Sequence, residues 1–190
     1  MTHGLKKTAA TAAWALLAIA VAPSAQALTL QGGSLFATAD EEITITLSGI
    51  STAYRDRLTL ADSDDVLFDS QQSALGANRS LGMMPSGGEL VFRLNVLEPD
   101  GDSYAWFSGP ASRNADNTQH ARILDLGGNR WRLSWEDLSL FDPLFDGDFN
   151  DLMFIVESRP IPVIPEPATL SLVGLGLGAT GWVRRRRKRR

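Results

Sequence analysis

The 190-residue sequence contains no cysteine. This absence excludes disulfide bonds, thiolate catalysis, and zinc or iron–sulfur sites built on thiolates. Histidine is almost as scarce, because His120 is the only one outside the first 27 residues. A Ser-His-Asp triad would depend entirely on His120, and no G-x-S-x-G motif is present. We therefore expect no catalytic residues and no enzymatic activity, and we expect His120 to be an ordinary histidine at a strand edge.

Positive charge is scarce in the middle of the chain. The formal net charge is −4, but residues 1–27 and 161–190 hold two and seven of the 18 basic side chains. Residues 28–160 carry nine basic and 21 acidic side chains, a net charge of −12. An acidic segment of this size repels the phosphates of nucleic acid. We expect no nucleic-acid partner.

The N-terminus has the pattern of a secretory signal peptide. Lys6 and Lys7 precede an apolar, alanine-rich stretch, and Ala25 and Ala27 lie at positions −3 and −1 before Leu28. A positive start, a short apolar region and small residues at the cleavage site are typical of such signals. The sequence predicts a signal helix over residues 1–27 that signal peptidase removes; the alternative is an uncleaved membrane anchor.

The C-terminus contains a second hydrophobic segment with different flanks. Residues 159–167 are rich in proline, which predicts an extended linker. Residues 168–183 are 16 residues without a charge, and residues 184–190 are seven consecutive basic residues. We interpret them as a short transmembrane helix and a cytoplasmic tail, since basic residues flanking a membrane span stay in the cytoplasm. The acidic domain is then outside, as the signal peptide also requires.

This tail resembles a known sorting signal. Pro165, Glu166 and Pro167 are followed by a glycine- and leucine-rich span and then by the arginine cluster. The three parts, in this order, resemble the PEP-CTERM tail of Gram-negative bacteria. The resemblance implies recognition by exosortase, an integral membrane protease that processes its substrates near the Pro-Glu-Pro motif. It also implies a host that makes exopolysaccharide, an inner-membrane intermediate, and a final place at the cell surface or in the biofilm matrix.

Between the two ends, hydrophobic residues alternate with polar ones. Ile43, Ile45 and Leu47 share one face of a predicted strand, and Trp131, Leu133 and Trp135 share one face of another. Half-buried strands of this kind form antiparallel sheets with one face toward a core. Turn signals separate them, including a Gly-Gly-Asn turn at 127–129 that predicts a hairpin. Residues 28–158 are therefore expected to form an all-β domain, an antiparallel β-sandwich or jelly roll of roughly eight strands.

The polar stretches around these strands are expected to be exposed loops. Residues 111–119 and 71–79 are two of them, and they carry no recognisable catalytic constellation. The tryptophans allow two interpretations, since aromatic faces can stack on sugars in carbohydrate-binding sandwiches. Trp131 and Trp135 share their face with Leu133, which favours the core, whereas the facing of Trp106 stays open.

The densest group of acidic residues lies just before the last predicted strand. Hard oxygen ligands at alternating positions suit Ca²⁺, which takes six to eight oxygens. The D-x-D-x-N run at 146–150 matches the start of a calcium loop, but Asp151 stands where an EF-hand needs glycine, so this is no EF-hand. The candidate calcium ligands are Asp146, Asp148, Asn150 and Asp151, with Glu136 and Asp137 as weaker candidates. The alternative is that these residues are turn formers whose side chains bond backbone N–H groups.

This stretch also carries a second resemblance. A Trp-Glu-Asp-Leu segment followed by Asp-Gly-Asp-Phe-Asn-Asp and a hydrophobic strand resembles the end of an uncharacterised bacterial surface domain. The resemblance covers roughly residues 117–157 and implies a β-rich extracellular domain associated with calcium, without an established activity. Two hypotheses follow: a non-enzymatic envelope or matrix protein, or alternatively a calcium-dependent module that binds exopolysaccharide.

Overall fold

The computed structural model describes residues 28–31 and 33–161. The predicted signal helix with Ala25 and Ala27, the transmembrane helix at 168–183 and the Pro165–Glu166–Pro167 motif lie outside the described residues. Within the described part, no helix is long and apolar enough to cross a membrane. The only helix there is a three-residue 3-10 turn, η1 (Ala111–Arg113).

The domain is all-β, as the alternating pattern predicts, with twelve strands rather than roughly eight. The extra elements are short, such as the two-residue strands that edge two of the sheets. The strands are β1 (Leu28–Gln31), β2 (Ser34–Ala37), β3 (Glu41–Ile50), β4 (Arg55–Leu60), β5 (Phe68–Asp69), β6 (Asn78–Met84), β7 (Glu89–Leu90), β8 (Phe92–Leu97), β9 (Ser103–Phe107), β10 (Ala121–Asp125), β11 (Arg130–Trp135) and β12 (Leu152–Pro160).

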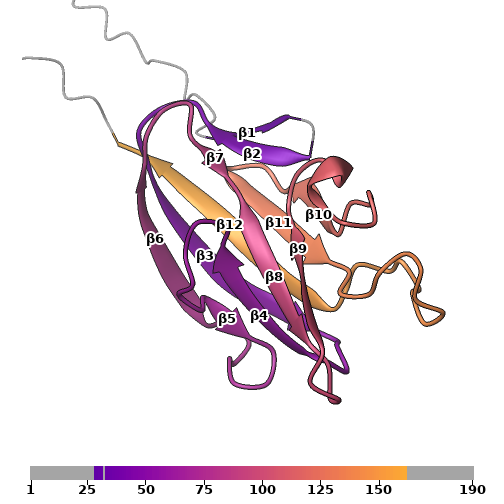
Figure 1. Cartoon of the computed structure of the whole chain (residues 1–190). Coiled ribbons are helices and arrows are strands. Elements are labelled where there is room, and N and C mark those ends of the chain that lie inside the picture. Colours follow the sequence, from indigo (N-terminus) through magenta and orange to yellow (C-terminus); the bar gives the residue numbers. More distant parts are fainter. Residues whose placement is uncertain (1–27, 32, 162–190) are drawn as a thin grey trace, which may run out of the picture.

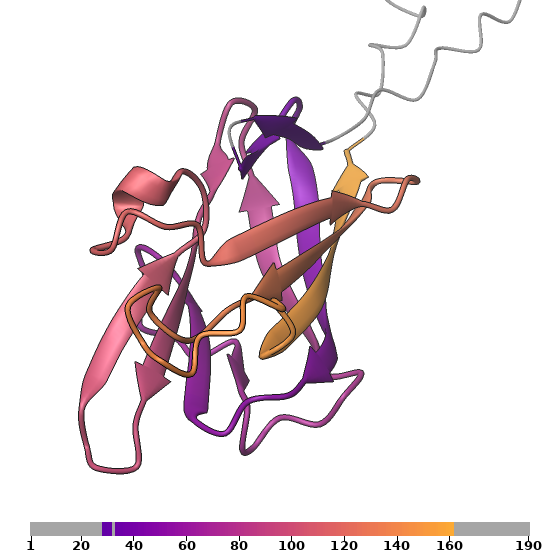
Figure 2. The ribbon, with the colours of Figure 1, turned by 90° about the vertical axis from the view of Figure 1, so that its right-hand side faces the viewer.

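The strands form three antiparallel sheets. A five-stranded sheet has the order β10-β11-β12-β3-β6, and a four-stranded sheet has the order β5-β4-β8-β9. These two sheets make the layers of the sandwich (Figures 1 and 2). A third sheet, β1-β2-β7, lies at the end of the molecule where β12 finishes (Figure 1). The predicted hairpin is confirmed: β10 pairs with β11, and Asn129 in its turn has the positive φ of 60°.

The core lies between the two main sheets. In the five-stranded sheet, Trp131 and Trp135 are buried, which confirms that they are core residues and not an exposed platform. Phe154 of β12 crosses the interior and contacts Phe92 of β8, with ring centroids 4.8 Å apart in an edge-to-face arrangement. Such a contact contributes beyond the area it buries. Trp106, whose facing the sequence left open, is also buried.

The register of β11 and β12 determines where the acidic residues meet. Trp135, the last residue of β11, pairs with Leu152, the first residue of β12. Glu136 and Asp137, which follow β11, and Asp151, which precedes β12, must therefore lie at the same end of the sheet. The nine residues of β12 span roughly 26 Å, so this end is far from the end of β12 that leads to the C-terminal tail.

Candidate metal centre

The loop between β11 and β12 carries the acidic residues and stands out from the sandwich in Figure 1. Figure 2 shows it between the β8–β9 hairpin and β12. Its start is fastened to β9, because the indole N–H of Trp106 donates to the carbonyl oxygen of Asp137 at 2.7 Å. The loop, which connects two strands of the five-stranded sheet, is therefore also hydrogen-bonded to the four-stranded sheet.

Within the described residues, two groups of three carboxylates come close enough to hold a metal ion. In each group, one oxygen from every member lies within 4.8 Å of the others. We call Glu136, Asp146 and Asp148 the outer group and Glu136, Asp137 and Asp151 the inner group. Oxygens bound to one Ca²⁺ at 2.3–2.6 Å are at most about 5 Å apart, so both groups match that size.

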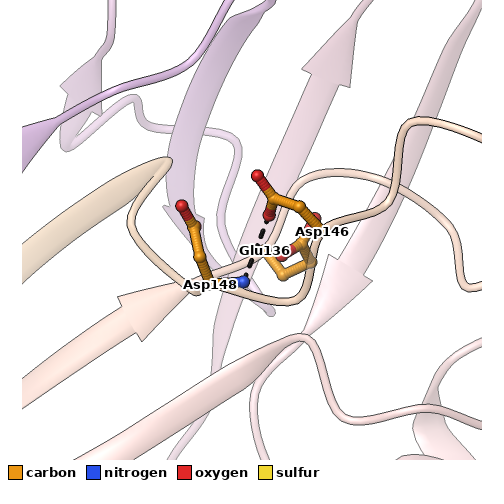
Figure 3. A group of neighbouring side chains, drawn as sticks. All are labelled: Glu136, Asp146 and Asp148. Atoms are coloured by element: carbon orange, nitrogen blue, oxygen red, sulfur yellow. Dashed lines mark hydrogen bonds between the residues drawn. The ribbon is translucent and has the colours of Figure 1, made fainter.

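The outer group combines one buried and two exposed carboxylates. Glu136 is only 1% exposed, and Figure 3 shows its side chain beside Asp146 and Asp148. The backbone of Phe149 hydrogen-bonds the Glu136 carboxylate. The other oxygen, Oε2, has no hydrogen-bond partner in the described part of the chain. A buried carboxylate oxygen without a partner is costly unless a proton or a cation compensates it.

The inner group joins three segments of the fold. The backbone N–H of Asp137 donates to Asp151 Oδ2 at 2.8 Å. The hydroxyl of Thr52, in the connection from β3 to β4, donates to Asp137 Oδ2. The backbone N–H of Ser51, beside it, donates to the carbonyl oxygen of Asp151 at 3.0 Å. Asp137, which follows β11, and Asp151, which precedes β12, are thus hydrogen-bonded to the connection that follows β3.

Burial and mutual repulsion raise the pKa values of these carboxyls. Burial is the largest cause for Glu136 and Asp137, and the charge of Asp146 adds to it. Burial, together with the charges of Asp137 and Glu136, raises the pKa of Asp151 to about 7. None of the described ion pairs involves these residues. Without a cation, the ionised forms of these carboxyls are therefore disfavoured.

Asp56, a further acidic residue near Asp137 and Asp151, is not among the ligands that the sequence predicts. It lies on β4, is fully buried, and neither carboxylate oxygen has a hydrogen-bond partner among the described residues. Burial, followed by the charges of Asp137 and Asp151, raises its pKa to about 8. A signal existed, because Asp56 has the same phase along its strand as the buried Leu58. An acid at an inward position of a strand is unusual enough to indicate a special site.

The structure places the calcium ligands that the sequence predicts in two different groups. Asp146 and Asp148 meet Glu136, whereas Asp151 meets Glu136 and Asp137. Glu136, a weaker candidate in the sequence, therefore belongs to both groups. The side-chain amide of Asn150 donates to Asp148, so Asn150 supports a carboxylate. Phe149, between them, has a φ of 59°, a left-handed conformation that is strained for an aromatic residue.

The turn-forming interpretation also has its evidence. Asp146 Oδ1 accepts the backbone N–H of Asp148 at 3.1 Å, drawn in Figure 3, and Asp148 Oδ1 accepts that of Asn150 at 3.0 Å. These bonds shape the loop in the way that Asp and Asn shape turns. A carboxylate has about four lone-pair sites, so forming a turn does not use up its capacity for a cation.

The loop at 111–119, which the sequence predicts to be exposed, is exposed only in part. Asn114 is buried, and the side chain of Asp116 is 3% exposed. Asp116 Oδ2 lies 3.0 Å from His120 Nε2, while His120 Nδ1 lies 3.0 Å from the carbonyl oxygen of Glu136. The His120 ring is fully buried and stacks on Trp106 with centroids 3.7 Å apart. His120 lies directly before β10, the edge strand of the five-stranded sheet, but it is buried, and it supports the backbone of Glu136.

Fold and site together define an antiparallel β-sandwich with a buried carboxylate cluster at one end. Residues 163–188 match the PEP-CTERM protein-sorting motif, which confirms that the tail is a PEP-CTERM sorting signal. The motif implies an exported protein that passes through the membrane and is processed by exosortase. A comparison with curated proteins finds no match.

Proposed function

We propose that residues 28–161 form the non-enzymatic, calcium-binding domain of an exported envelope or matrix protein of a Gram-negative bacterium. In this proposal, signal peptidase removes residues 1–27 and exosortase processes the tail. The mature domain then acts at the cell surface or in the extracellular matrix. The observation that carries the calcium site is Glu136, a buried residue with an unpartnered Oε2, whose carboxylate lies in a group with Asp146 and Asp148.

Calcium fits this group by charge, ligand type and size. The outer group offers three carboxylates, and the remaining positions of a six- to eight-coordinate ion can be taken by water and backbone oxygens. Two of the three carboxylates are exposed, so an ion can enter from solvent. Extracellular calcium modules bind with a Kd of roughly 10⁻⁴ to 10⁻³ M, which is the range we assign to this site.

The state of His120 supports a structural or binding role over a catalytic one. It is the only histidine of the described residues. Both of its ring nitrogens lie at 3.0 Å from oxygen atoms of the protein, and the ring is fully buried. A general base must reach its substrate, which a histidine enclosed in this way does not.

The proposal predicts that calcium raises the melting temperature of the full-length protein. With 10 mM Ca²⁺ and a Kd near 10⁻⁴ M, binding stabilises by about 2.7 kcal/mol, a shift of roughly 10 °C for a domain of this size. Differential scanning calorimetry in Ca²⁺ and in EDTA measures the shift. Asp148→Asn should reduce it by more than half. Asp125→Asn, at the last residue of β10, is the matched control and should not. An equal melting temperature in Ca²⁺ and EDTA would refute the proposal.

A cavity elsewhere favours the second candidate function, calcium-dependent carbohydrate binding. It has a volume of about 480 Å³ and lies on the outer face of the four-stranded sheet. Arg57, Arg93, Asn95 and Tyr104 are among its lining residues, and they combine hydrogen-bonding groups with an aromatic ring. Ligand sites commonly have this volume and a few convergent polar groups. The cavity shares no lining residue with the carboxylate groups, so calcium would act on it through the fold.

This candidate predicts retention on an immobilised polysaccharide that depends on both the cavity and calcium. Pull-down on alginate and on dextran, with Ca²⁺ and with EDTA, measures it. EDTA and Arg93→Gln should each reduce retention at least fivefold. Arg79→Gln, an exposed arginine on β6, is the control and should leave retention unchanged. Equal retention in Ca²⁺ and EDTA would count against calcium dependence, and equal retention of Arg93→Gln would exclude the cavity.

A further inference from the structure

The inner group has the features of a cation site of its own. Glu136 and Asp137 are 1% and 2% exposed, and their oxygens lie within 4.8 Å of one another and of Asp151. The hydrogen bonds from Thr52 and from the backbone of Asp137 each engage an Oδ2 atom. These bonds fix the orientation of both aspartates.

Charge balance indicates that one divalent cation is too few. The two groups together hold five carboxylates, and none of them takes part in a described ion pair. With all five carboxylates ionised, one divalent ion in the outer group would leave a charge of about −3, and a second would reduce it to about −1. Residues 133–157 contain no basic side chain, and the nearby Arg122 lies over the Phe149 ring and forms no described ion pair with these carboxylates.

Asp56 gives an independent indication from the other layer of the sandwich. It approaches from β4, interacts electrostatically with Asp137 and Asp151, and is fully buried. Neither of its oxygens has a hydrogen-bond partner in the described part of the chain. Buried polar atoms are nearly always compensated by a partner. Asp56 belongs to neither carboxylate group, but it lies close enough to Asp137 and Asp151 for their charges to act on it.

We propose that the inner group binds a second divalent cation, with the Glu136 carboxylate bridging the two ions. The bridge rests on the proposed calcium site in the outer group. The inner site itself rests on Glu136, Asp137 and Asp151, and on the buried Asp56 of β4. Because all inner ligands are carboxylate oxygens, the ion is a hard cation such as Ca²⁺. Its role is structural: it joins the end of β11 to the start of β12 and, through Thr52, to the end of β3.

The test is a count of bound calcium ions on the full-length protein by native mass spectrometry, with isothermal titration for affinity. The unaltered protein should bind two ions. Asp148→Asn should lose the outer ion, and Asp151→Asn should lose the inner one, because each variant keeps its turn-forming acceptor and removes only charge. Glu136→Gln, which removes the bridge, should weaken both ions at least a hundredfold. Asp125→Asn should bind two.

Each alternative result has a defined meaning. One ion that disappears in Asp148→Asn but persists in Asp151→Asn overturns the second site and leaves the proposed function standing. One ion that disappears in both variants means a single shared site and also overturns it. No ion in the unaltered protein overturns both proposals. Circular dichroism checks that every variant is folded, and Asp137→Asn replaces Asp151→Asn if that variant is not.

Discussion

Without calcium, the domain is expected to lose stability as the pH rises from 5 to 8. The main cause is Asp56, whose pKa is raised from 3.8 to about 8 by burial and then by the charges of Asp137 and Asp151. Between these two values the folded protein holds a proton that the unfolded chain releases. Stability is therefore complete below pH 4 for this group and falls as the pH rises toward 8.

The expected loss is large for a small domain. A difference of about four pH units corresponds to roughly 6 kcal/mol for one fully buried group, because each unit is worth about 1.4 kcal/mol. Asp151, whose pKa is raised to about 7, changes in the same direction over a narrower window. Calcium should oppose the loss, since a divalent ion favours ionised carboxylates and binds more tightly as they deprotonate.

Urea unfolding from pH 5 to pH 8.5, in EDTA and in Ca²⁺, measures this dependence. In EDTA, Asp56→Asn should be more stable than the unaltered protein at pH 8, by about 3 kcal/mol after the cost of a buried amide. At pH 5 the difference should vanish or reverse. Asp125→Asn should follow the unaltered protein throughout. A free energy of unfolding in EDTA that is flat between pH 5 and 8 would show that Asp56 does not titrate as described.

Local sequence was sufficient to predict the all-β class of the domain, one of its hairpins and the buried faces of its strands. The alternation at Trp131, Leu133 and Trp135 predicted both a strand and its buried face, and the structure places all three in the core. The β10–β11 hairpin followed from the Gly-Gly-Asn turn. These features depend on period and turn chemistry, which a short window of sequence contains. The three-sheet order does not, because strands as far apart in sequence as β3 and β12 are neighbours.

The candidate site shows the same limit. The acidic loop was visible in the sequence because its members are adjacent in the chain. The contributions of Thr52, Asp56 and Trp106 were not visible, because these residues lie in the connection after β3, on β4 and on β9, respectively. The weight given to Glu136 was too low for a similar reason. Only the pairing of β11 with β12 places Glu136 between Asp148 and Asp151.

Asp116→Ala is expected to destabilise the domain by about 3–5 kcal/mol, the second large effect. Asp116 Oδ2 accepts hydrogen bonds from the backbone N–H of Leu140 at 3.1 Å and from Ser139 Oγ at 3.4 Å, and it lies 3.0 Å from His120 Nε2. Burial alone would raise the pKa of Asp116, but the bonds from Leu140, His120 and Thr118 lower it. Removing this carboxylate leaves several buried polar groups unpaired, which is the costly case.

The same substitution should weaken calcium binding without touching a proposed ligand. Asp116 holds residues 139 and 140, at the start of the acidic loop, and through His120 it supports the backbone of Glu136. We expect at least a tenfold loss of affinity in isothermal titration, alongside the loss in urea unfolding at pH 7. Because the pKa of Asp116 is lowered, its contribution should be present at neutral pH and disappear as the pH falls through that lowered value.

Asp142→Ala is the matched control for this prediction. Asp142 lies in the acidic loop and forms a similar turn, accepting the backbone N–H of Leu144 at 2.8 Å, but it is solvent-accessible and belongs to neither carboxylate group. Its loss should cost less than about 1 kcal/mol and leave calcium affinity unchanged. If Asp116→Ala and Asp142→Ala prove equal in both measurements, then the His120–Asp116 pair does not position the metal site, and the loop is held by the strand ends and Trp106 alone.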